Sequence, residues 1–134
     1  MAKQNKKVVK KVKKKVALNV TEHGRVYVTS TFNNTLITVT NDKGDALGWS
    51  SSGSKGFKGT RKSTPYAASM AAEDIVKQIV AKGLKSADIF IKGPGSGRES
   101  SLRGIRSAGL TILSISDITP MPHNGPRAKK KRRV

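Results

Sequence analysis

Residues 24–51, GRVYVTSTFNNTLITVTNDKGDALGWSS, contain three stretches of β-forming residues separated by two short polar turns. In the first stretch, Val26 and Val28 alternate with polar residues, which is the period of a strand with one buried face. The turns contain Asn-Asn and Asn-Asp-Lys-Gly, which are typical of tight connections. We expect strands at 24–31, 36–40 and 45–51. Because the connections are short, these strands form an antiparallel meander.

The chain after the meander alternates helices and strands. Pro65, with Thr64 as the expected N-cap, begins an apolar repeat at three-to-four spacing that Gly83 ends. The expected elements that follow are a strand at 88–92, a turn at 93–97, a helix at 99–108 and a strand at 110–118. Strand, helix, strand, helix, strand requires crossovers and hence parallel pairing. The sequence predicts an α/β fold with a five-stranded mixed sheet, an antiparallel meander followed by two β-α units, and two helices.

Both ends of the chain are basic and contain no acid. Residues 1–16 carry eight lysines, and 127–134 carry six lysines and arginines, out of 27 in the whole chain. Such runs repel their own compaction, so we expect a disordered basic N-terminal arm at 1–16, one α/β RNA-binding domain at 17–119 and a basic C-terminal arm at 120–134. Nucleic acid is the polyanion that best matches these arms, because phosphate contacts release condensed counterions.

Other classes of protein lack support in the sequence. The chain has no cysteine, no apolar run long enough to cross a membrane, and no signal-peptide pattern. We expect His23 and His123 in exposed positions, and neither has a carboxylate or histidine at metal-ligand spacing. We therefore expect no enzyme activity, no catalytic residues, no metal site, no cofactor and no membrane partner.

Two glycine-rich segments are candidate RNA contacts. The loop at 50–64 alternates glycines with Lys55, Lys58, Arg61 and Lys62, and long loops in small domains are usually functional. The turn GPGSGR at 93–98 lies between a strand and a helix, where backbone amides and the helix dipole favour an anion. It is either an RNA phosphate site or a tight turn without a ligand. Arg98, Arg103 and Arg106 favour the phosphate site, because guanidinium matches phosphate oxygens.

The aromatic residues allow several interpretations. Phe57 either stacks on an unpaired base or anchors its loop to the core. Tyr27, Phe32 and Phe90 are expected in the core, and Trp49 is open to both roles.

Five strings identify a family: TFNNT at 31–35, GFKGTR at 56–61, TPYAA at 64–68, IKGPGSGR at 91–98 and DITPMPHNG at 117–125. With the basic end that follows them, they closely resemble the bacterial and plastid form of small-subunit ribosomal protein eleven over roughly 20–134. The resemblance implies a ribonuclease-H-like α/β fold without nuclease activity.

The resemblance also implies a function and a set of contacts. It implies a structural constituent of the small ribosomal subunit that binds the central domain of ribosomal RNA on the platform, near the path of messenger RNA at the exit site. Expected partners are small-subunit ribosomal RNA, neighbouring platform proteins and messenger RNA, in a bacterial cytoplasmic ribosome or, alternatively, in the plastid stroma. The RNA-binding positions predicted from the residues and the resemblance together are Lys55, Lys58, Arg61, Lys62, Gly95, Arg98, Arg103, Arg106, Asn124, Arg127, Lys129, Lys130, Lys131, Arg132 and Arg133.

Two other functions compete with this one. A DNA-binding architectural protein is the main alternative, since phosphate-directed cations do not distinguish DNA from RNA. A purely protein-binding module would need a large exposed apolar patch, which a sequence does not display.

Overall fold

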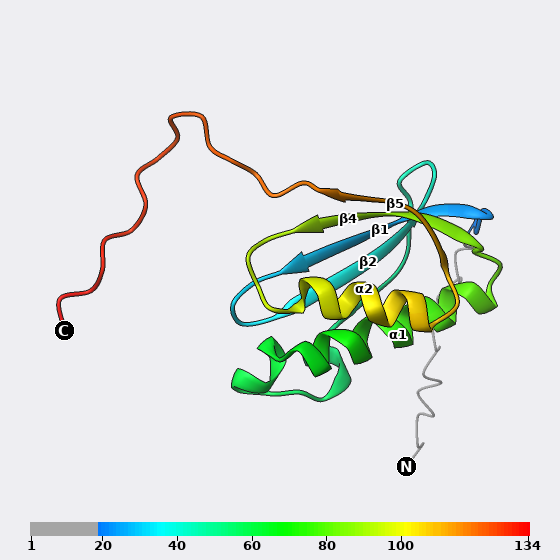
Figure 1. Ribbon diagram of the computed structural model, residues 1–134, viewed down its shortest axis with the longest axis horizontal. Coiled ribbons are helices and arrows are strands. Elements are labelled where there is room, and N and C mark those ends of the chain that lie inside the picture. The colour runs from blue at the N-terminus through cyan, green and yellow to red at the C-terminus, as the bar shows by residue number, and fades with distance from the viewer. Residues whose placement is uncertain (1–18) are drawn as a thin grey trace, which may run out of the picture.

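The computed structural model describes residues 19–134. The predicted N-terminal arm at 1–16 lies outside these residues. The elements run β1, β2, β3, α1, β4, α2 and β5 along the chain, with two short 3-10 helices between β3 and α1 (Figure 1).

The five strands form one mixed sheet in the order β3-β2-β1-β4-β5. β2 is antiparallel to both β1 and β3, whereas β4 is parallel to β1 and to β5. This sheet, with its two helices, confirms the predicted α/β fold class. The strands are β1 His23–Ser30, β2 Thr35–Asn41, β3 Ala46–Ser51, β4 Ser86–Lys92 and β5 Thr111–Asp117.

The helices are α1, Pro65–Ala81, and α2, Gly97–Ser107. The side chain of Thr64 accepts a hydrogen bond from the amide of Ala67, which confirms it as the N-cap of α1. Gly83, at φ +121°, and Gly109, at φ +91°, follow the last turns of the two helices in the left-handed region that favours glycine. Helix α2 begins two residues earlier than the sequence predicts.

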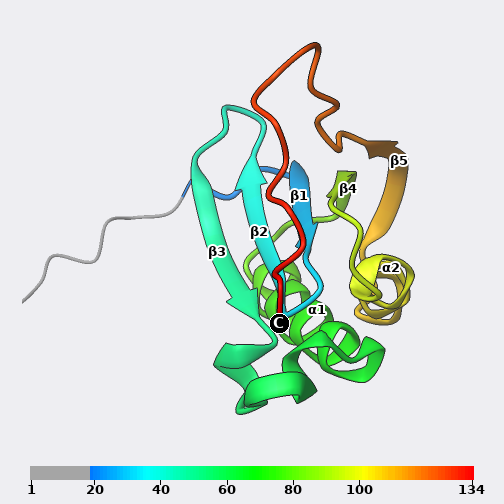
Figure 2. The same cartoon turned by 90° about the vertical axis from the view of Figure 1, so that its left-hand side faces the viewer.

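Both helices pack on one face of the sheet (Figures 1 and 2). Alternate strand residues such as Val26, Val28 and Ile89 point to this face and are buried, together with the small residues of α1. The helices approach each other closely at Gly104, where an added Cβ would lie 2.6 Å from the carbonyl oxygen of Ser69. Both helices also start at the same end of the sheet (Figure 1), beside the turns that the sequence marks as candidate RNA contacts.

Within residues 19–134, no helix covers the other face of the sheet (Figure 1), and this changes the expected roles of the aromatic residues. Strand register places Trp49, Thr38, Tyr27 and Phe90 in one row across this face. The rings of Tyr27 and Phe90 stack at 5.3 Å and are half-buried, so these two side chains lie outside the core between sheet and helices. The expectation of a core position is also wrong for Phe32, which lies in the β1–β2 turn and is 77% exposed. Alternation predicted the strands but not which face the helices cover.

The connection from β3 to α1 is more ordered than the predicted loop. It contains the 3-10 helices Gly53–Lys55 and Gly59–Ser63. Ser51 and Ser54 bond each other's backbone amides through their hydroxyls, with O to N distances of 3.1 and 2.9 Å, which closes the first turn. The loop is therefore folded, and its cations are carried by an ordered backbone.

The C-terminal arm at 120–134 contains neither helix nor strand, and all its residues are exposed. Figure 1 shows it leaving the end of β5, on the side where α1 and α2 begin. Asn124, at φ +59°, is the only non-glycine residue with a positive φ in the described part of the chain. The expected left-handed bend before Gly125 is thus present.

Candidate RNA-binding surface

The 3-10 helix Gly59–Ser63 and the turn before α2 meet at one end of the domain. The hydroxyl of Ser96 donates a hydrogen bond of 2.6 Å to the carbonyl oxygen of Ser63, although 33 residues separate them. A hollow of about 440 Å³ opens there, lined by Pro65, Gly95, Ser96, Arg98, Glu99, Ser100 and Arg103. The first turns of α1 and α2 both border it, so two helix dipoles raise the potential at this end. The fold thus unites two candidate contacts that the sequence treats separately.

The loop cations differ in whether they form ion pairs within the protein. Lys55 forms an ion pair with Asp74 of α1, whereas no ion pair of Lys58, Arg61 or Lys62 occurs in the described part of the chain. Lys58 and Arg61 are exposed and Lys62 is half-buried. These three cations can reach a ligand without first breaking an ion pair, whereas Lys55 would exchange one carboxylate partner for another anion.

Phe57 packs against the helix that follows its loop. Its ring meets that of Tyr66, edge to face, with centroids 6.0 Å apart. Phe57 is half-buried and Tyr66 is exposed. This contact supports anchoring, although to α1 rather than to the core, and base stacking by Phe57 stays a prediction.

Gly95 is required by packing inside the protein. It is buried, and an added Cβ would lie 2.3 Å from both the hydroxyl oxygen of Ser30 and the carbonyl oxygen of Thr31. Its amide donates a hydrogen bond of 3.1 Å to the carbonyl oxygen of Ser30. The close approach that glycine permits here is to the end of β1, and direct contact of Gly95 with RNA stays a prediction.

Other amides of the turn also have protein partners. The amide of Gly97 donates to the hydroxyl of Ser30 at 3.2 Å, and that of Gly93 donates to the hydroxyl of Thr119 at 3.2 Å. These amides of the turn are therefore not free to bind an anion, and the predicted anion site has fewer backbone donors than the sequence suggests. Its remaining backbone donors are in the first turn of α2, after Gly97, where a helix leaves amides without intrahelical partners.

Arg98 links the turn to the last strand. Its guanidinium donates at 2.6 Å to the carbonyl oxygen of Gly93 and at 2.6 Å to a carboxylate oxygen of Asp117. A hydrogen bond from Thr119, followed by the one from Arg98, holds the pKa of Asp117 well below its usual range. Arg98 has a structural role here, and it also lines the hollow, so its remaining N–H groups stay predicted phosphate donors.

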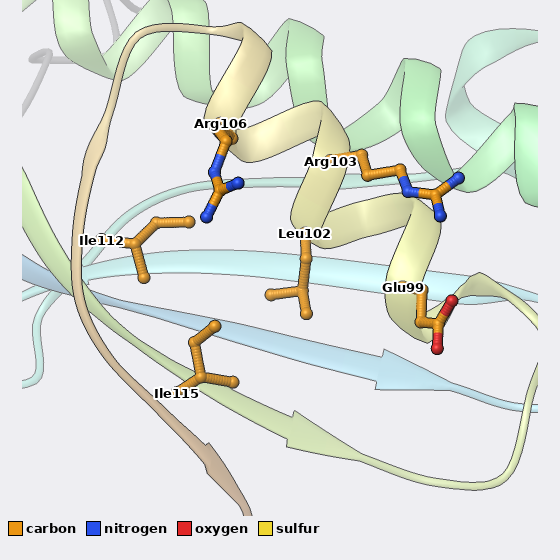
Figure 3. A pocket seen from close by; sticks show the side chains of 6 residues that line it. All are labelled: Glu99, Leu102, Arg103, Arg106, Ile112 and Ile115. Carbon is orange, nitrogen blue, oxygen red and sulfur yellow. The ribbon is translucent and has the colours of Figure 1, made fainter.

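Arg103 and Arg106 lie on α2 but face different surroundings. Arg103 borders the hollow at the helix N-termini and a second hollow with Tyr66 and Ser69. Arg106 lies one turn further on, beside Ile112, at a groove between α2 and β5 (Figure 3). Of these two predicted contacts, Arg103 is the one next to the loop cations.

Comparison with known proteins identifies the family. The profile of the family described as "Ribosomal protein S11" matches residues 24–133. The chain belongs to this ribosomal protein family. A chloroplast-type relative from Mesostigma viride, described as "Small ribosomal subunit protein uS11c", is 53% identical over 135 residues, covering 100% of both chains. The family assignment made from the five sequence strings is confirmed.

Membership of this ribosomal protein family is consistent with what the sequence and fold contain. In residues 19–134 no cluster of three or more histidine, cysteine, aspartate or glutamate side chains is arranged to hold a metal. No helix in that part of the chain is both long and apolar enough to span a bilayer.

Sequence reasoning missed several partners that strand pairing creates. His23 is half-buried rather than exposed as expected, and its Nε2 lies 3.1 Å from a carboxylate oxygen of Asp88 on the neighbouring strand, a contact that the sequence did not predict. A hydrogen bond from Ser114 is the main cause that lowers the pKa of Asp88. Burial opposes it, and the hydrogen bond with His23 adds a smaller lowering. Register pairs Asp88 with Ser114 and Asp117 with Ile91, so the two aspartates project to opposite faces of the sheet. No local sequence signal reports these contacts, because they depend on which strands become neighbours.

Proposed function

We propose that this protein is a structural constituent of the small ribosomal subunit that binds ribosomal RNA with the end of the domain where α1 and α2 begin. The observation that carries the proposal is the hydrogen bond between Ser96 and Ser63, which holds the loop cations beside the hollow at both helix N-termini. Unpaired cations and helix dipoles at one site favour a polyanion over a small neutral ligand.

The C-terminal arm extends this surface. It leaves β5 at the same end of the domain and carries Arg127, Lys129, Lys130, Lys131, Arg132 and Arg133 (Figure 1). Its bend at Asn124 turns the chain at the hinge, before these charges begin. The domain and the arm would then contact separate parts of one RNA, with the arm contributing affinity in proportion to the phosphates it neutralises.

The finer assignment is the one that the sequence resemblance implies. The RNA is the central domain of small-subunit ribosomal RNA, on the platform near the exit-site path of messenger RNA, and neighbouring platform proteins are the further partners. The compartment is a bacterial cytoplasm or a plastid stroma; the chloroplast-type relative favours neither over the other. Within this proposal Lys58, Arg61 and Arg103 bind phosphates directly, while Gly95 shapes the turn that positions them.

A pair of double variants tests this proposal. Lys58→Ala with Arg61→Ala removes two cations from the proposed surface. Lys43→Ala with Lys82→Ala removes two exposed cations near the opposite end of the domain. Binding of each to a central-domain RNA fragment is measured across a salt series, with a DNA duplex of equal length as competitor.

We expect the first pair to weaken RNA binding and to lower the slope of log K against log salt by about 1 to 2, since each lost phosphate contact lowers the slope by about 1. The control pair should leave the slope nearly unchanged. Equal losses from both pairs would mean diffuse electrostatic attraction without this site. Equal competition by the DNA duplex would favour the architectural alternative.

A further inference from the structure

An apolar groove runs between α2 and β5, beside the proposed RNA surface, and the two share Glu99 and Arg103. It has a volume of about 250 Å³ and is lined by Glu99, Leu102, Arg103, Arg106, Ile112 and Ile115. Figure 3 shows Leu102 and Ile115 pointing toward each other across it, with Arg106 beside Ile112. The floor is aliphatic, and the charged groups stand at the rim.

The strand that borders this groove is the exposed edge of the sheet. β5 is the last strand in the order, and its side chains are mostly uncovered, with Leu113 60% and Ile115 52% exposed. Ile118 and Met121, just beyond it, are also exposed. A long apolar edge strand is a hazard for a free protein, and natural proteins usually cover or charge such edges.

The backbone of β5 also has hydrogen-bonding groups directed outward. The amide of Ile118 donates to the carbonyl oxygen of Ile91 on β4 at 2.8 Å, so it points inward. Backbone direction alternates along a strand, and the amide of Ile115, an odd number of residues away, therefore points outward. No described strand lies beyond β5 to accept it. Ile115 thus offers an outward amide and a side chain in the groove.

This surface does not suit RNA. Phosphates need cations, and unpaired bases stack on flat aromatic or guanidinium faces, whereas the groove floor is aliphatic and β5 contains no aromatic or basic residue. An extended polypeptide suits it, because main-chain hydrogen bonds can continue the sheet while alternate side chains enter the groove.

We propose that the β5 edge and this groove bind an extended segment of a neighbouring protein, which adds a sixth strand to the sheet. Its aliphatic side chains, at alternate positions, contact Leu102 and Ile115, and a carboxylate pairs with Arg106. The proposal rests on the proposed function in that the neighbour is another protein of the same ribosomal particle.

Charge selects this occupant over segments of the same chain. Residues 1–18 carry eight lysines and no acid, so they would bring like charge to a rim on which Arg103 and Arg106 outnumber Glu99. A second copy would bring together two chains that each have a net charge of +19. A segment with carboxylates among aliphatic residues complements both the rim and the floor.

Photocrosslinking in purified small subunits identifies the occupant directly. The probe is p-benzoylphenylalanine in place of Leu113, in full-length protein incorporated into the subunit. We expect the crosslink on one neighbouring protein, at a segment that alternates aliphatic residues and includes an acid. A crosslink to RNA, a crosslink to a second copy, or no crosslink overturns the proposal.

Two variants of Ile115 then test the strand pairing. Ile115→Pro removes the outward amide, and edge strands tolerate proline because no neighbouring strand uses that amide. Ile115→Val retains the amide as the matched control. We expect proline to lower the crosslink yield at least fivefold with an unchanged circular dichroism spectrum, and valine to retain it. Equal yields from both variants would refute strand addition.

Charge reversal at Arg106 separates this inference from the proposed RNA surface. Arg106→Glu should lower the crosslink yield about tenfold, while the affinity of the free protein for the central-domain RNA fragment falls no more than with Lys43→Glu. If RNA affinity falls further than in that control, Arg106 belongs to the RNA surface and the groove assignment is wrong. If RNA binding fails in every variant and in wild type, the proposed function fails independently of the groove.

Discussion

Substituting alanine for Gly95 tests whether this glycine serves RNA binding or the fold. The added Cβ would lie 2.3 Å from two oxygen atoms, the Ser30 hydroxyl and the Thr31 carbonyl, about 1 Å closer than ordinary contact. The hydroxyl can rotate, but the carbonyl belongs to the backbone at the end of β1. The turn or the strand end must therefore move.

The expected cost follows from two opposing effects. Overpacking that forces backbone shifts costs about 1–3 kcal/mol. Replacing glycine restricts the unfolded chain and returns about 0.4–1 kcal/mol. The net loss is about 1–2 kcal/mol, which for a domain of this size lowers the melting temperature by about 5–15 °C.

Thermal melting followed by circular dichroism measures the effect on full-length protein. Gly125→Ala is the matched control, because its new Cβ would meet only a side-chain atom of Pro122, at 3.2 Å, in the exposed arm. RNA affinity is then measured well below both melting temperatures. If Gly95→Ala melts within about 1 °C of wild type while its RNA affinity collapses, the glycine serves an RNA contact and the packing argument is refuted.

Three further outcomes are expected. Arg98→Ala should lower both the melting temperature and RNA affinity, because the guanidinium bonds Gly93 and Asp117 within the protein and Arg98 also lines the hollow. An unchanged melting temperature in thermal denaturation would contradict the structural link. The pKa of Asp117 is lowered in the folded state, so the stability that its carboxylate contributes is complete above the unfolded pKa of about 3.9. This stability is lost as the pH falls toward the folded pKa. In acid titrations, wild type should therefore lose more stability than Asp117→Asn between about pH 4 and 2. Gly125→Val retains every charge but restricts the backbone after the bend at Asn124, so it should reduce incorporation into small subunits, as measured by sedimentation. If this variant incorporates normally while deletion of 127–134 abolishes incorporation, only the charge of the arm matters.

Much of the fold was predictable because its signals are local. Strand alternation around Val26, the proline and threonine before α1, and the glycines after both helices each depend on neighbours within a few residues. The family was predictable for a different reason: strings such as GFKGTR and IKGPGSGR together resemble it, and the family profile matches residues 24–133. The left-handed Asn124 was likewise foreseen from the Asn-Gly pair.

The errors occur where a contact spans the chain. Alternation made Tyr27 and Phe90 strand residues but did not say that both helices would cover the opposite face. Phe32 was expected in the core as a strand residue, yet it lies in the turn between β1 and β2 and is 77% exposed. Arg98 was predicted only as an RNA contact, and its bond to Asp117 follows from the packing of α2 beside β5.

The amino-acid sequence by itself determined the strands, the two helices, the basic ends and the family, because helical and strand periodicity, caps and charge act between near neighbours or along the whole chain. Only the tertiary structure decided that Ser63 and Ser96 meet, that Gly95 packs on Ser30, and that β5 is an uncovered apolar edge. These features depend on strand order and on the helices sharing one face. Both are set by burying one side of the sheet, a property of the whole domain that no single segment encodes.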